Sequence, residues 1–131
     1  MSKWTPVDRV TRMEPGKGAQ GVRNVPNTLA ILDSHFPRFP VLPGVLILGS
    51  LAELAGRFLQ QETSRSWHLA GAEQVRYRHF VRPGDQMELA VELKELSAEG
   101  AVFSGTVRVE GKVMTTARQL RMVPREGRGA P

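Results

Sequence analysis

The chain has 131 residues, with 18 lysines and arginines against 13 aspartates and glutamates, and it contains no cysteine. This length suits one soluble domain with its own core, so we expect a single domain rather than a multidomain assembly. The absence of cysteine excludes disulfides, iron–sulfur clusters, thiolate zinc sites and a thiol nucleophile, and it fits a reducing compartment. The net charge of +5 leaves nucleic acid, membrane surfaces and acidic proteins open as partners.

The first ten residues contain charges and a proline where a secretory signal needs a continuous apolar stretch. No later apolar run approaches the ~20 residues of a membrane span, so we expect a cytoplasmic protein without a transmembrane segment. Nucleic-acid binding is disfavoured because the sequence shows no recognition helix, aromatic stacking platform or zinc spacing. We also expect neither a metal site nor a cofactor.

The first third of the chain predicts a short extended element followed by a stiff loop. Residues Val7–Val25 contain strand-like segments around a turn at residues 14–17, and we expect an edge element at most. In the loop that follows, prolines at every third residue restrict the backbone and exclude a regular helix or a central strand: Pro37, Pro40 and Pro43. This loop carries one histidine, His35.

A long helix is predicted over Val45–Gln61, with Pro43 near its start, where a missing N–H costs nothing. Its apolar residues lie almost all round, which is typical of a helix buried in a domain. The exceptions recur at helical spacing: Gly49, Glu53, Gly56 or Arg57, and Gln60.

After Trp67, apolar and polar residues alternate as they do in strands. The predicted strands are Val75–Val81, Met87–Leu96, Ala101–Glu110 and Val113–Val123, with turns at 82–85, 97–100 and 111–112. Four antiparallel strands after one buried helix predict an α+β fold in which the sheet curls around the helix. We expect residues 1–123 to form this domain and residues 124–131, which lack an apolar anchor, to be a disordered tail.

The histidine loop and the start of the helix resemble the signature of the 3-hydroxyacyl-acyl-carrier-protein dehydratases. The family pattern is His-Phe-Pro-Gly-x-Pro-x-Met-Pro-Gly-Val-Leu, with a glutamate further along the helix, and here it corresponds to residues 35–47, His-Phe-Pro-Arg-Phe-Pro-Val-Leu-Pro-Gly-Val-Leu-Ile. The similarity continues in order through residues 7–10, 14–17, 24–25, 82–86 and 111–112. It implies the hotdog fold of that family, a long helix wrapped by an antiparallel sheet, and a dimer.

The resemblance implies dehydration of a 3-hydroxyacyl chain that acyl carrier protein holds through a phosphopantetheine arm. This reaction needs a base for the C2 proton, an acid for the departing 3-hydroxyl group and a donor for the thioester carbonyl. His35 is the predicted catalytic residue because it exchanges protons near neutral pH. Gly44 and Val45 are predicted substrate contacts, since unpaired amides at a helix start can polarise a carbonyl.

Two positions depart from the family pattern. Arg38 replaces a glycine and adds a charge near the mouth of the site, where it is a candidate substrate contact. Gly49 stands where the family has its catalytic glutamate, so the acid–base pair is incomplete, and the space could take an acyl chain or a partner's side chain. Glu53, one turn further, could reach back as a replacement acid. Alternatively it faces a partner subunit or pairs with Arg57.

The sequence leaves two main functions open. The first is a dehydratase-like enzyme of fatty acid, lipid or polyketide biosynthesis that uses His35 and an unusual acid. The second is a non-catalytic or half-catalytic subunit, because the family builds each site across a dimer and a paralogue could contribute the glutamate. The expected partners are therefore acyl carrier protein and a second hotdog chain, in a homodimer or a heterodimer. A hotdog thioesterase is disfavoured by the His-Phe-Pro signature.

Several arginines form either a basic rim for an acidic carrier protein or a solvated strand face. They are Arg38, Arg76, Arg78, Arg82, Arg118 and Arg121.

Overall fold

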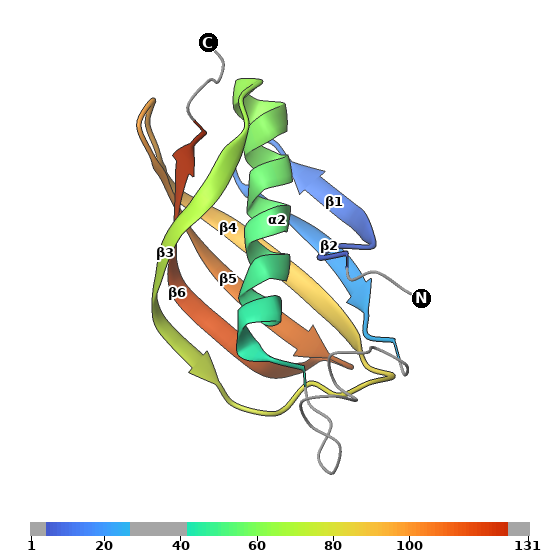
Figure 1. Ribbon diagram of the computed structural model, residues 1–131. Helices are drawn as coiled ribbons and strands as arrows, with labels where there is room; N and C mark the ends of the chain where they lie inside the picture. Colours follow the sequence, from blue (N-terminus) through green and yellow to red (C-terminus); the bar gives the residue numbers. More distant parts are fainter. Residues whose placement is uncertain (1–4, 27–41, 126–131) are drawn as a thin grey trace.

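The computed structural model describes residues 5–26 and 42–125, in which one α-helix packs against the inner side of a curved antiparallel sheet (Figure 1). The helix, α2, spans Gly44–Thr63. The strands are β1 (Arg9–Glu14), β2 (Gly18–Asn24), β3 (Trp67–Tyr77), β4 (Gln86–Leu96), β5 (Ala101–Val109) and β6 (Lys112–Pro124). This arrangement confirms the expected α+β architecture of a sheet wrapped around one long helix.

The strands follow the order β1-β2-β4-β5-β6-β3 across the sheet, and neighbouring strands run antiparallel. The expectation of an edge element at most is wrong for β2, which lies between β1 and β4 and pairs with β4 from Gly18 to Asn24. The segment was predicted to be strand-like, but its glycines lack the apolar side chains that indicate an interior strand. These glycines allow close approach of the neighbouring strand. A Cβ at Gly18 would collide with the carbonyl oxygen of Val91 in the neighbouring strand.

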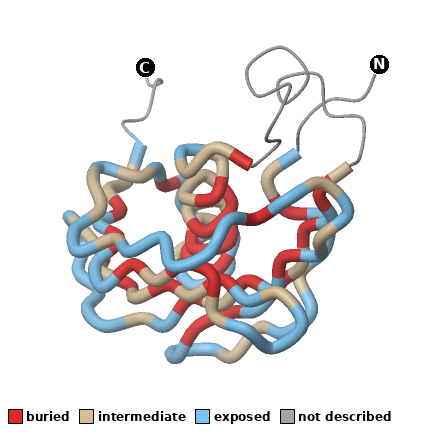
Figure 2. The backbone as a smooth tube through the Cα atoms, turned by 90° about the horizontal axis from the view of Figure 1, so that it is seen from below, coloured by how far each residue is buried: buried red, intermediate tan, exposed pale blue. Residues whose placement is uncertain are grey.

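Helix α2 begins one residue before the predicted Val45–Gln61 and ends two residues after it. Ser64 ends the helix in the left-handed conformation, with its N–H donating to the Gln60 carbonyl at 2.8 Å. One side of the helix is buried against the sheet, where Phe58 meets Phe103 edge to face at 5.8 Å between ring centroids. Figure 2 shows buried residues gathered where helix and sheet face each other.

The other side of α2 is open in the single chain, so the expectation of a helix buried all round is only partly met. Val45 is 74% exposed, although it is apolar and lies in the first turn. Its exposure follows from topology, because the sheet curls around one side of the helix and no described element covers the other.

Strand β3 begins at Trp67, eight residues before the predicted Val75. Its alternation is interrupted by a register shift between Leu69 and Gly71 and by Gln74, whose φ is 54°. Because of these irregularities, the alternation of apolar and polar residues did not predict the first part of the strand. β3 pairs with β6 rather than with β4, the next strand in the chain, and it forms one edge of the described sheet.

The connections agree closely with the predicted turns. Between β3 and β4, the Asp85 N–H donates to the Arg82 carbonyl at 3.1 Å and Gly84 has a φ of 92°, as a Pro-Gly turn requires. The last hairpin turns at Glu110 and Gly111, whose φ angles are 51° and 80°, one residue earlier than predicted.

At the end of the described chain, β6 continues to Pro124, one residue into the predicted tail. The N–H of Arg125 donates to the Ser66 carbonyl at 2.9 Å.

Over residues 5–26 and 42–125, no helix combines the length and the apolar character that a membrane crossing needs.

Candidate functional site

The structure places four of the predicted site residues on α2. Gly44 and Val45 form its start, and Gly49 and Glu53 follow on its open side. His35 and Arg38 lie outside the described residues, so their roles stay predictions.

The start of α2 carries backbone amides that no side chain of the described residues caps. Pro43 precedes the helix in an extended conformation, and the first turn contains no acidic residue. The Pro43 carbonyl accepts hydrogen bonds from the N–H groups of Leu46, at 3.0 Å, and Ile47, at 3.3 Å. The amides of Gly44 and Val45 lie ahead of these, at the positive end of the helix dipole, where a carbonyl oxygen would be stabilised.

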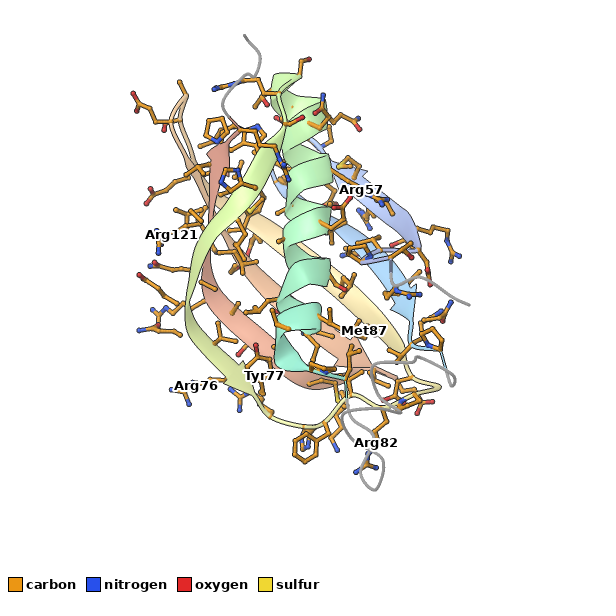
Figure 3. All side chains as sticks on the ribbon, in the orientation of Figure 1. Arg57, Arg76, Tyr77, Arg82, Met87 and Arg121 are labelled. Carbon is orange, nitrogen blue, oxygen red and sulfur yellow. The ribbon has the colours of Figure 1, made fainter. Side chains whose placement is uncertain are left out.

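Tyr77, the last residue of β3, packs against this helix start (Figure 3). Its hydroxyl donates to the Gly44 carbonyl at 3.3 Å. Burial raises the pKa of the Tyr77 phenol above its ordinary value of 10.0. Tyr77 was not among the site residues predicted from the sequence. The available signal was a lone tyrosine, the only one in the chain, at the end of a strand-like segment.

Gly49 and Glu53 border a cleft of about 540 Å³ between the open side of α2 and the start of β3. The residues that interrupt the apolar surface of the helix all line it, from Gly49 to Gln60. On the strand side the lining comes from Ser66, Trp67, His68 and Leu69, and Arg125 completes it. The polar stripe predicted on the helix therefore faces one cleft.

Neither glycine of this stripe is required by packing within the described chain. A Cβ added at Gly49 would meet no atom within 4 Å. At Gly56 the nearest atoms would be the Trp67 carbonyl oxygen at 3.8 Å and the Met122 Cε at 4.0 Å, which are ordinary contacts. The space beside Gly49 is therefore available to a group from elsewhere.

Glu53 is engaged by Arg57, one of the alternatives that the sequence left open. Arg57 Nε donates to Glu53 Oε2 at 2.9 Å, and both side chains are about two-fifths exposed. Arg57 lies one turn toward the C-terminus, so this contact directs the carboxylate away from Gly49.

The described arginines lie in separate places rather than along one rim. Arg78 and Arg82 line a second cleft, of about 520 Å³, together with Lys112, Tyr77 and Phe80. Arg121 lies further along the sheet, 3.8 Å from a carboxylate oxygen of Glu73. Figure 3 shows Arg76 and Arg121 pointing away from α2 at the β3 edge.

In the part of the chain that the structure describes, no group of three histidine or carboxylate side chains could hold a metal ion.

Sequence comparisons identify the family. The model of the ApeI-like family, described as ApeI dehydratase, matches residues 12–118. The 3-hydroxyacyl-[acyl-carrier-protein] dehydratase FabZ of Bacillus licheniformis is 36% identical over 114 residues, covering 85% of this chain and 79% of that protein. FabZ of Exiguobacterium sibiricum is 38% identical over 115 residues, with coverage of 85% and 81%.

Solved structures share the fold at low sequence identity. The dehydratase heterocomplex ApeI:P from Xenorhabdus doucetiae matches with a TM-score of 0.75 and 15% identity, covering 93% of this chain and 84% of that one. Smu.793 from Streptococcus mutans, bound to acetyl CoA, matches with a TM-score of 0.72 and 14% identity, with coverage of 98% and 95%. The hotdog fold, the FabZ relatives and the family match agree, and the chain belongs to the ApeI-like dehydratase family.

Proposed function

We propose that the chain is a dehydratase-like protein that acts on carrier-bound 3-hydroxyacyl thioesters through an incomplete acid–base pair. The observation that carries this proposal is the open space at Gly49, where the dehydratase signature has a glutamate. The start of α2 supports it, because amides that no described side chain caps are available to a thioester carbonyl.

In this proposal the amides of Gly44 and Val45 hold the thioester oxygen. Negative charge grows on that oxygen as the C2 proton leaves, and the positive end of α2 stabilises it. His35 removes the C2 proton. The 3-hydroxyl group must leave as water, which requires a proton that Gly49 does not provide. Loss of one acid–base group typically lowers the rate by about 10²–10⁴, so the chain alone should be a slow catalyst.

A second candidate function is a half-catalytic subunit that a glutamate-bearing hotdog paralogue completes. Two surfaces favour it. β3 is an edge strand of eleven residues in the described sheet, and an edge strand presents backbone groups for pairing. The exposed Val45 and the Gly49 cleft lie on the open side of α2, which a partner helix could cover. One solved protein of the same fold is a dehydratase heterocomplex.

Acyl carrier protein is the proposed source of the substrate. Arg78, Arg82 and Lys112 supply three positive charges to the second cleft, against two negative charges from Asp85 and Glu110. An acidic carrier would be favoured there by charge complementarity. Because Tyr77 also lines this cleft and contacts Gly44, a phosphopantetheine arm that enters through it would approach the start of α2.

The two candidates are separated by measuring dehydration of a 3-hydroxyacyl carrier substrate in two samples. One contains the purified chain alone, and the other contains it mixed with a hotdog paralogue that keeps the helix glutamate, sought beside this gene. Activity in the mixture that exceeds the sum of the two separate proteins supports the half-catalytic subunit. Turnover of order 1–10³ per second by the unmodified chain alone would show that its site is complete after all.

A further inference from the structure

Tyr77 holds one side of the peptide unit between Gly44 and Val45. The Gly44 carbonyl and the Val45 N–H belong to the same planar unit, so a contact that fixes one also fixes the direction of the other. The hydroxyl of Tyr77 donates to this carbonyl at 3.3 Å. Because no side chain among the described residues caps the helix, the tyrosine provides an external constraint on its first turn.

The tyrosine ring also packs directly on Gly44. A Cβ at position 44 would lie 2.7 Å from Cζ and 2.8 Å from Oη of Tyr77, closer than real side chains approach. The ring therefore occupies the space that any other residue at 44 would need. This contact joins the end of β3 to the first turn of α2 across 33 positions of sequence.

Tyr77 remains accessible from the other direction. Tyr77 is 49% exposed, and it lines the cleft that also contains Arg78 and Phe80. The residue thus lies between the cleft proposed for the carrier arm and the amides proposed for the thioester.

We propose that Tyr77 is a positioning residue for the thioester, which directs the Val45 N–H toward the carbonyl oxygen of the bound substrate. The inference rests on the proposed function, since it concerns the same amides. A hydrogen bond accepted by the Gly44 carbonyl polarises the peptide unit, which makes the Val45 N–H a stronger donor. The tyrosine acts through this peptide and needs no contact with the reacting carbons.

The test uses the full chain and hexanoyl-pantetheine with an isotope-labelled thioester carbonyl. This probe lacks a 3-hydroxyl group and cannot be dehydrated. Infrared difference spectroscopy reports hydrogen bonding to the labelled carbonyl, because stronger bonds to its oxygen lower the stretching frequency. We expect the frequency to fall when the probe binds the unmodified chain.

Tyr77→Phe keeps the ring and removes only the hydroxyl. It should weaken probe binding by about two- to tenfold, the effect of losing one hydrogen bond, and should reverse part of the frequency shift. Thr115→Val is the matched control. Thr115 lies opposite Tyr77 on the neighbouring strand β6, and its buried hydroxyl has no hydrogen-bond partner in the described structure. It should leave the frequency unchanged.

A bound probe with the same carbonyl frequency in Tyr77→Phe and in the unmodified chain overturns the positioning role and leaves the proposed function intact. An equal frequency change in Thr115→Val also overturns it, since the effect would then belong to general packing. If the unmodified chain does not bind the probe at all, the proposed function fails and the role of Tyr77 fails with it.

Discussion

Arg57 Nε donates to Glu53 Oε2 at 2.9 Å across one turn of α2. The carboxylate closest along the helix to the absent glutamate therefore already has a cationic partner. Both side chains remain about two-fifths exposed, and exposed pairs of this spacing contribute only about 0.3–0.5 kcal/mol. The ion pair is a competing role for Glu53, and its effect on catalysis can be measured directly.

Glu53→Gln should change the free energy of unfolding by less than about 0.5 kcal/mol, because it removes only an exposed pair. Dehydration by the chain should change by less than about threefold if the ion pair is the main role of Glu53. Urea unfolding and a steady-state assay check these values, with Arg57→Gln as the control for stability. A collapse of activity in Glu53→Gln alone would instead identify Glu53 as the relocated acid.

Gly49→Glu should raise dehydration by about 10²–10⁴ over the unmodified chain, the range that a general acid–base group contributes. Among the described residues, no atom lies within 4 Å of a Cβ at position 49, so the helix should accept the substitution. His35→Ala in the same background should abolish the gain.

Gly56→Glu is the matched control for this experiment. Gly56 lines the same cleft two turns along α2, and a Cβ there makes only ordinary contacts. It should give no gain in activity. An equal gain from both variants would mean that added negative charge in the cleft, rather than an acid at position 49, is responsible.

Asp8→Asn should destabilise the fold by about 2–3 kcal/mol in urea unfolding. Arg23 Nη1 donates to Asp8 Oδ1 at 3.0 Å, and the Arg23 side chain is only 6% exposed while that of Asp8 is 29% exposed. Breaking a buried ion pair typically costs about 3–5 kcal/mol, and the partial exposure of Asp8 reduces that figure. Glu14→Gln, which breaks the exposed Arg12–Glu14 pair, should cost less than about 0.5 kcal/mol. Equal effects in the two variants would contradict the importance of burial.

The ultraviolet absorbance of tyrosinate should show Tyr77 titrating at a higher pH in the folded chain than in denaturant. The signal is unambiguous because the chain contains one tyrosine. Burial raises the folded pKa above 10.0, so the folded state retains a proton that the unfolded state loses. The resulting contribution to stability is complete below pH 10 and disappears as the pH rises through the folded pKa. Tyr77→Phe should remove this alkaline loss of stability. Coincident titration curves in the two states would disprove it.

Arg78→Glu combined with Lys112→Glu should weaken binding of an acyl carrier substrate at least about tenfold at low salt, because both charges line the proposed docking cleft. Binding of free hexanoyl-pantetheine should change less than carrier binding, because pantetheine carries no charge. Surface plasmon resonance over a salt series measures the difference. The control of equal charge change is Arg76→Glu combined with Arg118→Glu, since both residues are exposed and lie outside this cleft. If the control weakens carrier binding equally, net charge rather than this cleft attracts the carrier.

The elements with strong local signals could be predicted from the sequence alone. The apolar run after Pro43 predicted α2 to within two residues at either end. The turns around Gly84 and Gly111 were found because a positive φ favours glycine and because proline precedes one of them. The pairing of Glu53 with Arg57 was among the alternatives, since residues four apart on a helix are neighbours by geometry.

Contacts between distant segments were decided only by the tertiary structure. The glycines of β2 interrupt any apolar alternation in the sequence. Their role, which is to let the backbone of β4 approach closely, is visible only once the two strands pair. The partner of β3 is the last strand rather than the next one, a choice that depends on the path of the chain around α2. The same path brings Tyr77 onto Gly44 across 33 positions, and no local spacing encodes a contact that exists only once helix and sheet have packed.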